Sequence, residues 1–259
     1  MDLDFTVLIA CYHGDKIDRF NDAIDSIIKN TLKPKEIILV QDGPVNKEMS
    51  LYIERLASDG VVTLIKIDNN QGLTNALNLG LKSVTTKYVL RVDSDDINSE
   101  TRFFEQMHEL SLGYDVVGSA INEYDDNNNF LSKKIMPQSH EEIARYLKHR
   151  NPINHMTVGF DVSKVRMVGG YPSLSLREDY GLWIKLISSN CNFKNSSESW
   201  VSVIRNEEMY KRRGGVKHII SELKLQRLLV KNKVNNIFES LLIGIVRISL
   251  ICLPAFLMK

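Results

Sequence analysis

The chain has 259 residues, of which 43% are hydrophobic and 25% charged, and its formal net charge is +1. These values suit one large or two small domains with a proper core. The charge is unevenly distributed, because residues 205–233 are strongly basic whereas residues 1–204 are mildly acidic. This distribution argues against a nucleic-acid partner. It favours a body that handles a cation and a C-terminal section that meets an anionic surface.

Cysteine use and the N-terminus indicate where the protein works. The three cysteines, Cys11, Cys191 and Cys252, are scattered and lack CxxC or Cys/His metal spacing. We therefore expect a reducing compartment. The N-terminal residues Met1–Asp4 are acidic and lead directly into an apolar run, so we expect no signal peptide.

The first part of the chain alternates between apolar runs and amphipathic segments. Runs of β-branched and apolar residues predict strands at 5–10, 36–40, 61–67 and 88–92. Helical spacing predicts helices at 18–29, 48–57 and 73–84. Gly80 lies on the apolar face of the third helix, where the missing side chain would let the helix approach the sheet. Parallel neighbours need crossover helices, so the pattern predicts a doubly wound parallel sheet.

A polar turn follows each of these strands. The turns place Tyr12, Asp42, Asn70 and residues 93–96 at the strand ends. Because ligands of doubly wound sheets bind at the carboxyl ends of the strands, we expect these side chains to share one rim. The sequence has no GxGxxG, GxxxxGK[ST] or GxSxG motif, which disfavours dinucleotide-binding, P-loop and serine-hydrolase interpretations.

The fourth strand runs into Asp93-Ser94-Asp95-Asp96, which places three carboxylates in four residues. Carboxylates repel one another, so folding alone gives little reason to gather them. A divalent cation does, because Mn²⁺ and Mg²⁺ bind carboxylate oxygens together with substrate phosphates. The alternative is an acidic turn in which Asp95 or Asp96 caps a helix that begins at Ile97, with Glu100 in its first turn.

The second half of the chain has a more mixed pattern. It predicts strands at 114–120, 130–135 and 156–160, the second pairing back antiparallel, and helices at 141–148 and 180–187. Glu178 and Asp179 come just before the last helix. The simpler interpretation is that their negative charges stabilise the N-terminus of this helix.

The C-terminal section predicts two helices of different character. Residues 216–229 form a basic amphipathic pattern, and residues 237–258 are strongly apolar but are broken by Gly244, Arg247 and Pro254. A charge in mid-span disfavours a transmembrane helix. We expect instead a helix in the membrane interface, with Arg247 turned to the headgroups. The alternative is a final core helix.

Six short motifs then occur in the order and spacing of a known family. They are Val7–Tyr12, Val40–Gly43, the NQGLxxALNxG pattern of 70–80, Asp93–Asp96, Val168–Tyr171 and the REDYxLW pattern of 177–183. Over roughly residues 5–190 the chain resembles the family 2 glycosyltransferases of the GT-A fold, most of all bacterial enzymes of O-antigen or exopolysaccharide assembly. It departs where Ala10-Cys11 replaces Pro-Val or Pro-Thr.

The resemblance implies an α/β GT-A fold with a mostly parallel, Rossmann-like sheet flanked by helices and a C-terminal helical tail. It implies a catalytic domain at 1–204, with a nucleotide-binding half at 1–100 and an acceptor-binding half at 101–204. Residues 205–259 would form the membrane-associating tail.

The resemblance also implies roles for particular residues. Those near the nucleotide-sugar would be Ala10, Tyr12, Asp42, Asn70, Gly72, Asp93, Ser94 and Arg212, with Tyr12 and Asp42 at the uracil. Arg212 or Arg213 would close over the diphosphate, or simply face the membrane. Asp95, helped by Asp93 and Asp96, would hold Mn²⁺ or Mg²⁺.

On the acceptor side, Asp179 matches the position of the catalytic base, with Glu178 beside it. His155 and Trp183 would contact the acceptor, although a core or capping role for His155 is an equal alternative.

The activity implied is inverting transfer of a hexose, glucose or galactose, from a UDP-sugar to a polyprenyl-diphosphate-linked sugar, through a β1,3 bond. The protein would work at the cytoplasmic face of the bacterial inner membrane. One alternative is a sugar-phosphate nucleotidyltransferase, which usually needs a glycine-rich basic loop that Cys11–Asp15 does not supply. Another is a non-catalytic membrane-binding domain.

Overall fold

The computed structural model describes residues 4–205 and 215–252. The strands are β1 (Phe5–Tyr12), β2 (Glu36–Asp42), β3 (Thr63–Ile67), β4 (Tyr88–Val92), β5 (Ile97–Asn98), β6 (Val116–Tyr124), β7 (Phe130–Lys134), β8 (Gly159–Asp161) and β9 (Phe193–Ile204). The helices are α1 (Ile17–Lys29), α2 (Lys47–Ser58), α3 (Leu73–Ser83), α4 (Arg102–Ser111), α5 (His140–Leu147), α6 (Val162–Met167), α7 (Glu178–Ser188), α9 (Val216–Lys231) and α10 (Ile237–Cys252).

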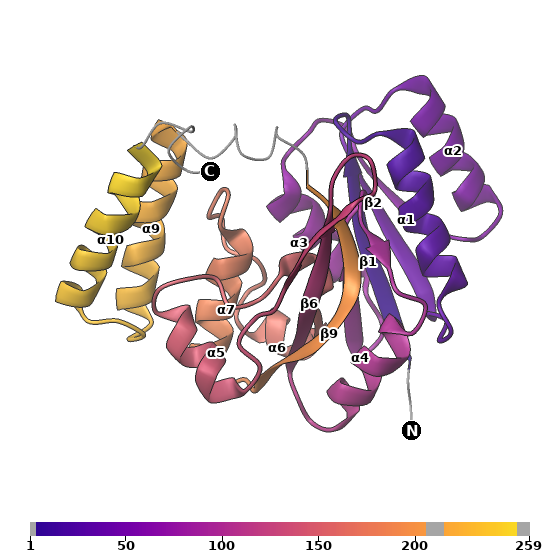
Figure 1. The fold of residues 1–259 in the computed structure, drawn as a ribbon. Helices are drawn as coiled ribbons and strands as arrows, with labels where there is room; N and C mark the ends of the chain where they lie inside the picture. The colour runs from indigo at the N-terminus through magenta and orange to yellow at the C-terminus, as the bar shows by residue number, and fades with distance from the viewer. Residues whose placement is uncertain (1–3, 206–214, 253–259) are drawn as a thin grey trace.

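One mixed sheet organises the molecule (Figure 1). Its strand order is β3-β2-β1-β4-β8-β6-β9-β5, and β7 pairs with β6. The four N-terminal strands pair in parallel, whereas β8 runs antiparallel to β4 and β6. The predicted parallel half is confirmed, as is the antiparallel return of β7 along β6.

Two hydrophobic clusters cover the two faces of the sheet. Helices α1, α2 and α4 pack on one face, and α3, α5, α6, α7 and α9 on the other. Close approach of α3 depends on Gly80, because a Cβ there would collide with side-chain atoms of Leu8 and Val40. The role predicted for this glycine is confirmed. Because β1 to β4 run parallel, their C-terminal ends lie at one edge of the sheet.

Two predicted elements differ in the structure. No helix begins at Ile97, because Ile97 and Asn98 pair with β9 as β5 and the next helix begins at Arg102. The cap interpretation of Asp95 and Asp96 is therefore wrong. The strand expected at 156–160 is a 3-10 turn at His155–Thr157 followed by the short strand β8.

Helices α9 and α10 form a hairpin that packs against α7 (Figure 1). Leu225 and Leu229 of α9 are fully buried in the same cluster as the α7 side chains. The expected boundary between 204 and 205 stays a prediction, but α9 shares the core of the body. None of the described helices is both long and apolar enough to cross a bilayer.

Arg247 of α10 does not face outward, so the expectation that it meets the headgroups is wrong. Its Nε lies 3.1 Å from an oxygen of Glu222, whose side chain is fully buried in α9, and its Nη1 donates to the carbonyl of His149 at 2.8 Å. The same Glu222 oxygen lies 2.9 Å from Nη2 of Arg177, at the N-cap of α7. An Arg–Glu–Arg triplet centred on the buried Glu222 carboxylate thus joins the hairpin to the start of α7.

We expect Glu222→Gln to lower the free energy of unfolding by about 3–5 kcal/mol, because two guanidinium groups would lose their buried anion. Urea unfolding followed by circular dichroism measures the change. Glu141→Gln, at an exposed position of α5, is the control and should leave the midpoint nearly unchanged. If Glu222→Gln lowers the free energy of unfolding no more than the control does, the triplet contributes little to stability.

Candidate active site

A cleft of about 390 Å³ lies at the C-terminal ends of the parallel strands. Eight of the residues expected near the nucleotide-sugar or the cation line it: Ala10, Tyr12, Asp42, Asn70, Gly72, Asp93, Ser94 and Asp95. They come from four strand ends that are distant in sequence, so the predicted convergence at one rim is confirmed. Cys11, Asp15, Leu73, Ala76 and Arg91 also line the cleft and were not predicted.

Asp42 organises one wall of this cleft. Its carboxylate accepts the backbone N–H groups of Gln71 and Gly72, each at 2.8 Å, and Asn70 Nδ2 donates to its carbonyl at 3.1 Å. Gly43 adopts φ +85°, and a Cβ there would lie 2.6 Å from the Asn70 nitrogen. The carboxylate expected at the uracil therefore also holds the 70–72 turn that leads into α3.

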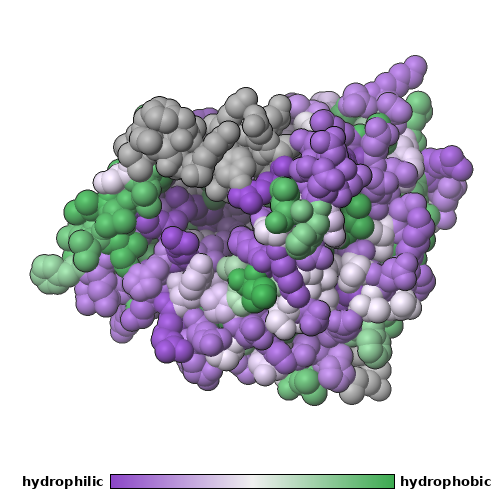
Figure 2. Space-filling model, viewed as in Figure 1, coloured by the Kyte–Doolittle hydropathy of each residue, from purple (hydrophilic) through white to green (hydrophobic). Residues whose placement is uncertain are grey.

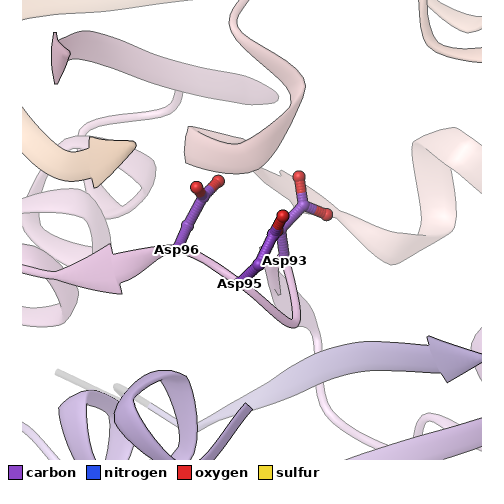
Figure 3. A group of neighbouring side chains, drawn as sticks. All are labelled: Asp93, Asp95 and Asp96. Atoms are coloured by element: carbon purple, nitrogen blue, oxygen red, sulfur yellow. The ribbon is translucent and has the colours of Figure 1, made fainter. Parts of the chain in front are cut away.

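The three carboxylates of the acidic turn lie together between β4 and β5 (Figure 3). Asp93, Asp95 and Asp96 each offer an oxygen, and these oxygens lie within 4.8 Å of one another. Asp95 is exposed, whereas Asp96 is buried. Burial, helped by the charge of Asp95, raises the pKa of Asp96 to about 8. An all-oxygen, carboxylate-rich set fits Mg²⁺ or Mn²⁺, and a cation would favour the ionised form of Asp96.

Asp15 is a cleft residue that sequence reasoning missed. Its Oδ2 accepts the Tyr12 N–H at 3.0 Å, and burial raises the pKa of its carboxyl to about 6. An Asp in a turn after a strand is also a common turn former, so the residue type alone gave no sign of a site. The signal available was its place after the first strand, on the same rim as Asp42.

Asp179 and Glu178 lie in the first turn of α7. Asp179 Oδ1 accepts the Tyr180 N–H at 2.7 Å, and Oδ2 accepts Asn151 Nδ2 at 2.6 Å. Burial raises the pKa of Asp179, and the Asn151 hydrogen bond opposes that shift. Neither acidic residue is among those lining the cleft. Arg91 connects the two regions, because its charge acts on Asp95 and Asp96 as well as on Asp179.

The remaining predicted residues are His155, Trp183 and Arg212, and neither His155 nor Trp183 lines the cleft. His155 Nε2 lies 2.9 Å from the Tyr171 hydroxyl, and burial lowers the pKa of His155 well below its ordinary value, so the ring is neutral at pH 7. Trp183 is fully buried against Phe193 and the His155 ring. The expectation that Trp183 contacts an acceptor is therefore wrong, because its side chain packs in the core. Arg212 lies outside the described residues.

The fold is that of the GT-A glycosyltransferases. The structure of Staphylococcus aureus TarS 1–349 in complex with UDP-GlcNAc superposes with a TM-score of 0.71, covering 91% of this chain and 69% of that chain at 16% identity. The model named "Glycosyl transferase family 2" matches residues 6–167. The chain belongs to glycosyltransferase family 2.

Two relatives are similar over most of the chain. One is the Escherichia coli UDP-Gal:alpha-D-GlcNAc-diphosphoundecaprenol beta-1,3-galactosyltransferase, 36% identical over 86% of this chain and 82% of its own length. The other is the amylovoran biosynthesis glycosyltransferase AmsE of Erwinia amylovora, 31% identical over 98% of this chain and 96% of its own. The chain is thus related to bacterial enzymes of O-antigen and exopolysaccharide synthesis.

Proposed function

We propose that the protein transfers a hexose from a UDP-sugar to a polyprenyl-diphosphate-linked sugar, with inversion at the anomeric carbon. Between the two hexoses expected from the sequence, glucose and galactose, we favour galactose in a β1,3 linkage. The observation that carries this choice is the 36% identity to a galactosyltransferase whose name states that donor, acceptor and bond. A cleft lined by Tyr12, Asp42 and the acidic turn supports nucleotide-sugar binding.

The residues of the site would have different roles in such a transfer. Asp42 and the turn that it holds would bind the nucleotide. A divalent cation held by Asp93, Asp95 and Asp96 would neutralise charge on the diphosphate leaving group. Asp179 would accept the proton of the acceptor hydroxyl as it attacks the anomeric carbon. Attack from the face opposite the diphosphate converts an α-linked donor into a β-linked product.

The donor and acceptor are tested by incubating the purified protein and Mn²⁺ with a panel of nucleotide-sugars, with and without GlcNAc-diphosphoundecaprenol. We expect UDP release from UDP-galactose that depends on the acceptor, and a product sensitive to β-galactosidase. Release of pyrophosphate from a sugar phosphate and UTP would favour the nucleotidyltransferase alternative. No turnover with any UDP-hexose would overturn the proposal.

We also propose that the C-terminal hairpin places the enzyme on the cytoplasmic face of the bacterial inner membrane as a peripheral protein. An apolar surface covers the hairpin (Figure 2). Its exposed members on α10 are Ile237, Phe238, Leu241, Leu242, Ile245, Val246 and Leu250. Arg227 and Lys231 of α9 line the groove beside this surface. Apolar residues flanked by basic ones match an anionic bilayer surface and would bring the enzyme to a lipid-linked acceptor.

Replacing Leu242, which is 66% exposed on α10, with Glu should weaken binding to vesicles that contain anionic lipid by about tenfold, because an apolar side chain is lost from the interface. Vesicle co-sedimentation measures the binding. Leu112→Glu is the matched control, since Leu112 is 61% exposed at the end of α4 and should not matter. An equal loss of vesicle binding in both variants, or no loss in either, would contradict docking through α10.

A further inference from the structure

Arg91 is a buried cation whose hydrogen bonds are only partly made. Its side chain is almost fully buried in β4, and its Nη2 forms an ion pair with Asp93. The Nε and Nη1 groups are buried as well, and neither has a hydrogen-bond partner among residues 4–205 and 215–252. Buried donors on a charged group are costly to leave unpaired, so nearly all of them have a partner in working proteins.

A second buried arginine shows what a structural guanidinium looks like in this protein. Arg102 of α4 is also fully buried, but its Nε donates to Gln106, its Nη1 to Asn98 and its Nη2 to the carbonyl of Arg91. The chain thus satisfies Arg102 with its own oxygens. It does not do the same for Arg91, whose Nε and Nη1 have no partner among the described residues.

That location lies between the acidic turn and the expected base. Arg91 alone is basic among the described residues that line the cleft. Its charge acts on Asp95 and Asp96 on one side and on Asp179 and Tyr171 on the other. In a single displacement, the transferred sugar must lie between the diphosphate held at the acidic turn and the acceptor hydroxyl held at the base. Arg91 lines the cleft together with Asp93 and Asp95, where that sugar would bind.

We propose that Arg91 binds the transferred hexose, with its Nη1 group donating to a hydroxyl oxygen of the sugar. This inference rests on the proposed function, since it assumes a UDP-hexose donor. Nη1 carries two N–H groups, whose directions are fixed by the plane of the guanidinium. The Asp93 pair holds Nη2, so this plane is oriented before the sugar arrives. Arg91 would thereby help to select the sugar as well as to position its anomeric carbon.

The test compares affinities for UDP-hexose and for UDP, both measured by calorimetry with Mn²⁺ and without acceptor. We expect Arg91→Gln and Arg91→Lys to weaken UDP-hexose binding by about 10- to 100-fold more than UDP binding, because loss of the Asp93 ion pair affects both ligands whereas loss of the sugar contact affects only UDP-hexose. Deoxy analogues of the hexose that lack one bonded hydroxyl should bind wild type more weakly but should bind Arg91→Gln no worse than the parent sugar does.

Arg102→Lys is the matched control for loss of a buried guanidinium. It should lower the melting temperature but leave the ratio of UDP-hexose to UDP affinity at its wild-type value. Equal weakening of UDP and UDP-hexose in the Arg91 variants would place Arg91 on the diphosphate and overturn the inference. Unchanged affinity for both would make Arg91 purely structural. If wild type itself bound no UDP-hexose, the proposed function would fail, which the Arg91 variants alone cannot cause.

Discussion

Asp179→Asn is expected to reduce sugar transfer by about 10²–10⁴-fold with the fold intact, because the amide cannot take the acceptor proton. The substitution changes little in size, and the amide oxygen can still accept one of the two hydrogen bonds that Asp179 receives from Tyr180 and Asn151. UDP release with the lipid-linked acceptor measures transfer. Calorimetry should show that UDP-hexose still binds, and thermal unfolding that the protein is folded.

Glu178→Gln provides the matched comparison, because Glu178 is the neighbouring carboxylate in the same helical turn. It should lose much less activity than Asp179→Asn. The reverse order would make Glu178 the base. Normal transfer by the Asp179→Asn protein would remove Asp179 from the mechanism.

The pH dependence of transfer gives a second view of Asp179. Burial raises the pKa of this carboxyl above its ordinary value. A general base works in its ionised form, so activity should be complete above the raised pKa and should fall as the pH drops through it. We expect the acidic limb of the kcat/KM profile to lie above the range of a free carboxylate and to vanish in the residual activity of Asp179→Asn. An acidic limb near pH 4 would contradict a buried base.

Asp95→Ala is expected to reduce transfer by at least about 10²-fold and to remove stimulation by Mn²⁺, because several kcal/mol of charge stabilisation at the leaving group depend on the cation. Asp95 is the exposed member of the cluster, whereas Asp96 is buried and Asp93 pairs with Arg91. Its removal should therefore disturb the fold least. Activity measured against Mn²⁺ concentration, after treatment with a chelator, tests the expectation.

Asp22→Ala, an exposed position on α1, is the control and should retain wild-type metal dependence. If Asp95→Ala keeps the same Mn²⁺ response as this control, the acidic turn does not hold the cation that the reaction uses. Loss of folding in Asp95→Ala would instead be visible in its thermal unfolding.

Sequence reasoning performed best where local patterns were strong. The strands β1 to β4 follow from apolar runs, because a parallel strand is buried on both faces. The helices α1 to α3 follow from helical spacing, because each buries one face. The shared rim followed from topology alone, since parallel strands must end at the same edge. It was weakest at β9, a serine-rich strand from Phe193 to Ile204 that carries little intrinsic signal. That strand is stabilised by its parallel pairing with β6, a partner about 77 residues earlier in the chain.

The α/β alternation and the family motifs are visible in the sequence because both depend on short-range order, and the alternation implies the edge where the carboxylates gather. The environments of individual charges depend on tertiary structure. In the sequence, Arg91 is one charge within a buried strand. In the structure, its Nε and Nη1 groups are buried without a partner among the described residues. Arg247 reads as a membrane-facing charge, yet it pairs with buried Glu222. A charge is stabilised by groups that surround it in space, and those groups come from distant parts of the chain.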